Sequence, residues 1–160
     1  MESLRAKSSS GVPIQELFLG KRIVRWITEE KPRRGGITVE FDDGSCLYVW
    51  FETIDLEAWE VTGALRVTDN FSASQARGVS NEPSSKRGFQ IRSVSLLRVD
   101  FDSNELELCV DNGLVLCGDE DQSITIVSSS GAGTTDVGLD CELNALETEY
   151  PAQSYRLVGC

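Results

Sequence analysis

The fold class is indicated by one stretch of the sequence, ITVEFDDGSCLYVWF at residues 37–51. Apolar and polar residues alternate over 37–41, which predicts a half-buried strand. The Asp43-Gly44 pair that follows is typical of a type I′ hairpin turn, in which both central residues need positive φ. Residues 46–51 then carry large apolar side chains on both strand faces, which predicts a returning strand in the centre of a sheet.

A second stretch, LELCVDNGLVL at residues 106–116, aligns without gaps on residues 37–47. Its Asp111-Asn112-Gly113 segment predicts a second hairpin, because Asn-Gly is the preferred type I′ pair. One interpretation is a duplicated unit whose two copies pack together, since a three-stranded meander cannot bury its apolar face alone. The alternative is that any two hairpins with such turns look alike.

The rest of the chain adds strands and one short helix to these hairpins. Pro13 and Gly20 flank residues that predict a helix over 13–19. Residues 52–63 are typical of either a short helix or a strand, and residues 128–138 of a flexible loop. Alternation and β-branched residues predict the remaining strands at 22–28, 64–68, 89–99, 104–110, 114–117, 123–127 and 155–158.

These elements predict a mainly β fold, either an antiparallel sandwich or a partly open barrel, built from two similar hairpin-containing halves and one short N-terminal helix. We expect residues 1–12 to form a flexible tail and 13–160 a single β-rich domain. The halves span about 20–68 and 89–127, and the polar stretch 69–88 is expected to be a mobile loop between them.

The composition indicates a globular protein and limits its expected location in the cell. The 160 residues are 40% hydrophobic and 26% charged, as in a globular protein. No window has the apolar length of a membrane span, and the N-terminus lacks the apolar region of a secretory signal. A cytoplasmic location is therefore expected.

The sequence contains no histidine and five cysteines, none with CxxC spacing. The absence of histidine excludes Ser-His-Asp and Cys-His catalysis and the commonest zinc ligand. Cys46 and Cys109 lie inside apolar strand patterns, so we expect them to be buried small hydrophobic residues. No cofactor and no metal site are expected.

Charge is the most informative feature for function. The chain has a formal net charge of −11 at pH 7, and residues 101–160 carry twelve acidic residues against one basic residue, Arg156. Such a surface repels nucleic acids and anionic membranes and attracts basic proteins. Solvation of these carboxylates is the simpler alternative.

The candidate partner-binding residues are carboxylates in or near the expected turns. Some of these acids also have a sufficient structural role, because Asp in a hairpin turn tolerates positive φ and accepts backbone hydrogen bonds. The set is Asp42, Asp43, Glu52, Asp55, Glu57, Asp111, Asp119, Glu120 and Asp121.

Three hypotheses about function follow. The first is a non-catalytic acidic domain that binds a basic protein, for example an immunity-type inhibitor that neutralises a toxin nuclease. The second is a small β-barrel enzyme or ligand-binding protein that uses carboxylates, with Tyr48 or Lys21 assisting. The third is a subunit of a larger assembly, in which the 69–88 loop becomes ordered on a partner. The oligomeric state stays open.

Overall fold

A computed structural model describes residues 2–28, 35–56, 61–76, 78–83, 88–102, 107–119, 121–129, 135–140 and 142–159. Its elements, in chain order, are β1 (Glu2–Leu4), β2 (Lys7–Ser8), α1 (Ile14–Phe18), β3 (Arg22–Thr28), β4 (Ile37–Phe41), β5 (Cys46–Asp55), β6 (Val61–Phe71), η2 (Ala73–Gln75), β7 (Val79–Asn81), β8 (Phe89–Gln90), β9 (Ser93–Asp102), β10 (Glu107–Cys117), β11 (Ser123–Ser128), β12 (Thr135–Leu139), η3 (Leu143–Ala145), η4 (Ala152–Ser154) and β13 (Tyr155–Gly159).

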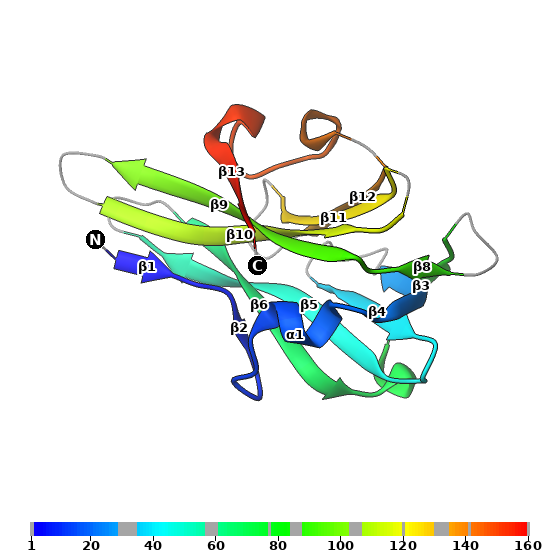
Figure 1. Cartoon of the computed structure of the whole chain (residues 1–160). Coiled ribbons are helices and arrows are strands. Elements are labelled where there is room, and N and C mark those ends of the chain that lie inside the picture. The colour runs from blue at the N-terminus through cyan, green and yellow to red at the C-terminus, as the bar shows by residue number, and fades with distance from the viewer. Residues whose placement is uncertain are drawn as a thin grey trace.

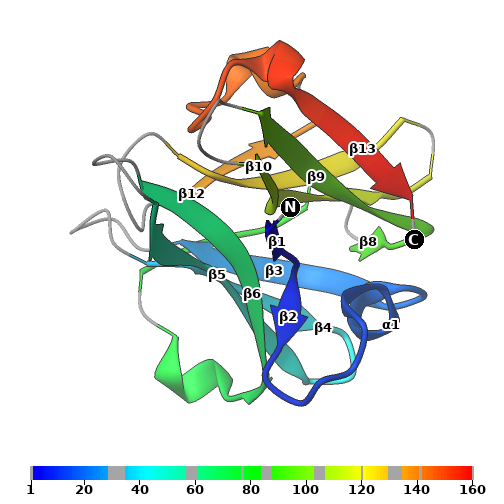
Figure 2. The same cartoon turned by 90° about the vertical axis from the view of Figure 1, so that its left-hand side faces the viewer.

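The strands form two sheets that pack face to face (Figure 1). Sheet A has the order β12-β11-β10-β9-β13, with β1 pairing beside β10. Sheet B has the order β2-β6-β5-β4-β3-β7, with β8 pairing beside β3. Figure 2 shows α1 at one side of the two sheets and β12 at the other. The prediction of a mainly β antiparallel sandwich with a short N-terminal helix is confirmed.

The first predicted hairpin is present, but its turn is of a different type. β4 and β5 pair antiparallel, and β5 is central between β4 and β6. Only Gly44 has positive φ, at 85°. Gly44 N–H donates to the Phe41 carbonyl at 3.0 Å, and Phe41 N–H donates to the Ser45 carbonyl at 2.9 Å. The turn therefore needs one left-handed residue, and glycine supplies it without steric cost.

The second predicted hairpin is wrong. Asp111, Asn112 and Gly113 lie inside β10, which runs unbroken from Glu107 to Cys117, and none of the three has positive φ. The pairing of β10 with β9 shifts between Asp111 and Gly113, which marks a β-bulge. Sheets A and B are each built mostly from one half of the chain, but the aligned residues form a hairpin in one sheet and a bulged strand in the other.

The N-terminal segment is not the expected tail. β1 pairs parallel with β10 of sheet A, and β2 pairs parallel with β6 of sheet B. Between them, Ala6 N–H donates to Asp111 Oδ2 at 2.7 Å. Residues 2–8 therefore cross from one sheet to the other, and each sheet gains a short edge strand from them.

The main core lies between the sheets and under α1. Its largest fully buried side chains include Phe18, Phe41, Ile23 and Leu65. Cys46 and Cys109 are buried, as predicted. No helix in the described part of the chain is long and apolar enough to cross a membrane.

Two expected loops contain strands, and strands enter the ambiguous stretch from both ends. Within 69–88, β6 continues to Phe71 and β7 pairs antiparallel with β3. Within 128–138, β12 begins at Thr135 and pairs antiparallel with β11. In 52–63, β5 continues to Asp55 and β6 starts at Val61, and residues 57–60, on which the choice between helix and strand depends, lie outside the described residues.

Candidate functional site

The carboxylates singled out from the sequence do not form one surface. Asp42 and Asp43 lie in the β4–β5 turn, and Asp55 lies at the far end of β5. Asp55 lies nine positions after Cys46 along this extended strand, a span of about 30 Å. Glu57 and Glu120 fall outside the described residues.

Several of these carboxylates already have a cation beside them. The Arg92 guanidinium contacts Asp119 at 2.9 Å, Arg66 contacts Glu52 at 2.8 Å, and Arg22 lies 3.8 Å from Asp42. Asp121 is exposed and has a φ of 61°, so its role in the β10–β11 turn is conformational. The turns are thus zwitterionic rather than purely anionic.

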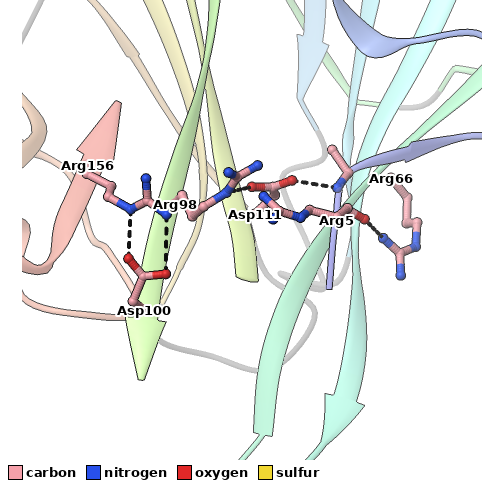
Figure 3. A network of polar contacts seen from close by, with 7 residues as sticks. Arg5, Arg66, Arg98, Asp100, Asp111 and Arg156 are labelled. Atoms are coloured by element: carbon pink, nitrogen blue, oxygen red, sulfur yellow. Dashed lines mark hydrogen bonds and ion pairs between the residues drawn. The ribbon is translucent and has the colours of Figure 1, made fainter. Parts of the chain in front are cut away.

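Asp111 is wrong as a partner-binding residue, because it is only 1% exposed. The Arg98 Nε–H donates to its Oδ1 at 2.7 Å, and Ala6 N–H donates to its Oδ2 (Figure 3). Next to it, the fully buried Asn112 donates to the Gly63 carbonyl at 2.8 Å and accepts from Tyr155 OH at 2.7 Å. These residues join sheet A to the N-terminal segment and to β6.

The electrostatic environment favours the charged form of three carboxyl groups. Hydrogen bonds from Ser45 lower the pKa of Asp43, and those from Ser10 and Ser9 lower the pKa of Asp69. The Arg156 guanidinium, which donates to Asp100 across the β9–β13 pair (Figure 3), lowers the pKa of Asp100. Carboxylates stabilised in this way are weak bases and poor general catalysts at neutral pH.

A groove opens between the two sheets on the side away from α1. It has a volume of about 350 Å³ and lies between β12 of sheet A and β3 with β7 of sheet B. Such a volume is at the small end of ligand sites and suits a compact group. Its lining residues are Trp26, Thr28, Asn81, Thr135, Asp136, Val137 and Leu139.

Local hydrogen bonds hold both walls of the groove. On sheet B, the Asn81 side-chain amide donates to the Val79 carbonyl at 3.2 Å and to the Trp26 carbonyl at 3.4 Å. On sheet A, the Thr135 hydroxyl donates to the Gly35 carbonyl at 3.0 Å and ties the start of β12 to the other sheet. The walls are therefore fixed before any ligand arrives.

Asp136 is the charged residue of the groove. Its Oδ1 accepts from Val137 N–H at 2.9 Å, and its Oδ2 accepts from Glu147 N–H at 2.8 Å. Both donors are neutral amides, and no ion pair joins Asp136 to a cation among the described residues. The charge of this groove-lining residue is therefore not neutralised by a cation among the described residues.

The surroundings of the groove are acidic and partly apolar. Asp140, Glu142 and Glu147 are exposed on the segment that follows β12 and returns to Asp136. The lining residue Leu139 is an exposed aliphatic side chain (36% exposed), and Val79 (41% exposed) lies on β7 two residues before Asn81. A negative groove with aliphatic side chains in and beside it suits a ligand that is both cationic and apolar.

Sequence reasoning missed this site because it assigned residues 128–138 to a loop. The signal that marks β12 is faint: five residues, TDVGL, with only two aliphatic side chains and an internal glycine. The acidity of residues 101–160 was recognised, but no pattern indicated that Asp136 and Trp26 line one groove between the two sheets. Comparisons with protein-family models, with curated proteins and with solved structures gave no match for this chain.

Proposed function

We propose that the chain is a non-catalytic binding domain that captures a basic protein through the groove between β12 and β3 with β7. The observation that carries the proposal is Asp136, a carboxylate in the groove wall whose two described partners are neutral backbone amides. A cationic side chain of a partner would complete its set of hydrogen bonds. Such charge-assisted bonds are about twice as strong as neutral ones.

The distribution of charge supports a protein partner. Residues 101–160 carry twelve acidic residues and a single basic one. Of these, Asp140, Glu142 and Glu147 are exposed on the segment after β12. Exposed negative charge accelerates the approach of a cationic protein and disfavours phosphate-bearing ligands. The exposed Leu139 and Val79 add apolar surface that a protein partner can cover.

An immunity-type inhibitor is the specific form of this function that we favour. Such a protein blocks a cationic toxin, for example a nuclease, by presenting carboxylates where the toxin binds phosphate. The sandwich suits that task because its groove walls are held by hydrogen bonds such as Thr135 to Gly35. A preformed site loses little entropy when the partner binds.

The proposal is tested by fluorescence anisotropy with a labelled peptide rich in lysine and arginine. The control peptide has the same length, with glutamate at the basic positions. We expect only the basic peptide, and not the glutamate control, to bind. Its affinity should fall as the sodium chloride concentration is raised, because exposed charges are screened within about 10 Å at 0.1 M salt. Equal binding of both peptides, or an affinity indifferent to salt, would contradict the proposal.

The inhibitor form is tested separately by identifying the genes next to this chain's gene and mixing the chain with any cationic nuclease that they encode. We expect stoichiometric loss of nuclease activity when the two proteins are mixed. Unchanged activity at saturating amounts of the chain would reject the inhibitor role and leave the peptide result standing.

A further inference from the structure

We infer that the groove recognises an inserted arginine side chain, and that it does not bind its partner by adding a strand to the β12 edge of sheet A. This inference rests on the proposed function and names the group that the groove selects. It is drawn from the hydrogen bonds of Asp136 and from the residues that line the groove.

The edge of sheet A beside the groove is partly blocked by one of its own side chains. β12 is the outermost strand on this side of sheet A. Its Val137 N–H is taken by the Asp136 carboxylate. An added strand needs free backbone groups at such an edge, and a side chain that occupies one of them opposes strand addition.

The carboxylate of Asp136 keeps acceptor capacity on both oxygens. A carboxylate offers about four lone-pair positions, and each Asp136 oxygen uses one in the described structure. Acceptor capacity therefore remains on both oxygens. A guanidinium presents two parallel N–H donors that match the two oxygens of a carboxylate, whereas an ammonium acts as a single point charge.

The rest of the groove fits the stem of the same side chain. Trp26, Val137 and Leu139 line it with apolar surface, while Thr28 and Asn81 add polar groups. Arginine buries its methylene groups along apolar surface and keeps its head on a polar partner. The aromatic residue of this groove, Trp26, belongs to the buried core, and its small exposed part adds to the apolar lining.

The test compares three labelled peptides of equal length: all-arginine, all-lysine, and all-arginine with N-methylated backbone amides. We expect the arginine peptide to bind about three- to tenfold more tightly than the lysine peptide, the equivalent of one further hydrogen bond. N-methylation should leave this affinity within about twofold, because side-chain insertion uses no backbone donor of the peptide. Equal affinity for arginine and lysine, or loss of binding on N-methylation, would overturn the inference.

Substitutions test whether the preference for arginine arises in the groove. D136N is expected to abolish the preference for arginine, and D43N, which removes an equal charge from the exposed β4–β5 turn, is expected to keep it. D136N could also weaken the hydrogen bond that Glu147 N–H donates to Asp136, so a second variant leaves Asp136 unchanged. L139K puts a cation beside the groove and should weaken binding of the arginine peptide at least tenfold. Its control, L19K, changes a leucine that is 53% exposed beside α1 and should change nothing.

The outcomes separate this inference from the proposed function. Binding of none of the three peptides means that the proposed function fails. Salt-dependent binding that is the same for arginine and lysine, or that D136N and L139K leave unchanged, retains the function and rejects the arginine groove.

Discussion

Arg98 on β9 and Asp111 on β10 lie opposite each other on neighbouring strands of sheet A. They form a buried ion pair, with 2.7 Å between Arg98 Nε and Asp111 Oδ1. The side chains are 11% and 1% exposed. Ala6 N–H donates to the other Asp111 oxygen, so the pair also fastens the N-terminal segment to sheet A (Figure 3).

Removing one member of this pair should be strongly destabilising. We expect D111A to lower the free energy of unfolding by about 3–5 kcal/mol, because it leaves the Arg98 charge buried without a partner. The matched control is D100A, whose partner Arg156 is exposed, and its cost should stay below about 1 kcal/mol. Urea denaturation measures both, and equal losses would show that Asp111 does not hold the fold in this way.

The N-terminal segment gives a second prediction. Leu4 packs against Val99, Val110 and Ala64 in a small cluster of buried residues. L4A should therefore cost about 1–3 kcal/mol of stability, because it removes half-buried methyl groups from a packed site. S3A, at an exposed position on the same strand, should cost less than about 0.5 kcal/mol. If the N-terminal segment were instead a flexible tail, neither substitution would change the stability measured by thermal or chemical denaturation.

Two tyrosines make stability depend on alkaline pH. Burial raises the pKa of Tyr150 and of Tyr155 above the ordinary value of 10. Tyr155 OH donates to Asn112, and Tyr150 OH donates to Thr62 Oγ1 at 2.6 Å. Because the folded pKa values exceed the unfolded ones, the stabilisation is complete below pH 10 and is lost as pH rises above it.

The measurement is the free energy of unfolding between pH 8 and pH 12 for the wild type and for Y150F/Y155F. We expect the wild type to lose stability steeply above about pH 10 and the double variant to lose it less steeply. If the free energy of unfolding fell equally with pH in the two proteins, the tyrosine hydroxyls would not be the source of the pH dependence.

Thiol reactivity gives a fourth prediction. Desolvation raises the pKa values of Cys46 and Cys109, so both stay protonated at neutral pH. Cys117 is partly exposed. In a C141S/C160S background, a thiol reagent should modify Cys117 first and reach the other two only on unfolding. Rapid modification of all three in the native protein would contradict the described burial.

The sequence predicts the parts of this fold in which local preference and tertiary environment agree. The β4–β5 hairpin is one such part, because alternation, the glycine and the aromatic return strand all favour it. Asp111-Asn112-Gly113 is the opposite case. Its local preference is a tight turn, yet Arg98, Gly63 and Tyr155 supply partners that let the two polar side chains lie buried in a strand.

The candidate site was less accessible to sequence reasoning. Its carboxylate lies on β12, a short edge strand whose pairing with β11 spans a stretch rich in serine and glycine. The opposite wall comes from β3 and β7, more than 50 residues earlier in the chain. Net charge indicated what kind of partner to expect, but only the packing of the two sheets brings Asp136 and Trp26 into one groove.

The most direct measurement of the central claim is a ¹⁵N NMR titration of the whole chain with the basic peptide. We predict that the largest shift changes fall on the groove walls, at Trp26, Thr28, Asn81 and residues 135–139, and that they shrink as salt is added. Changes confined to the turns at 42–45 and 118–122, or none at all, would contradict it.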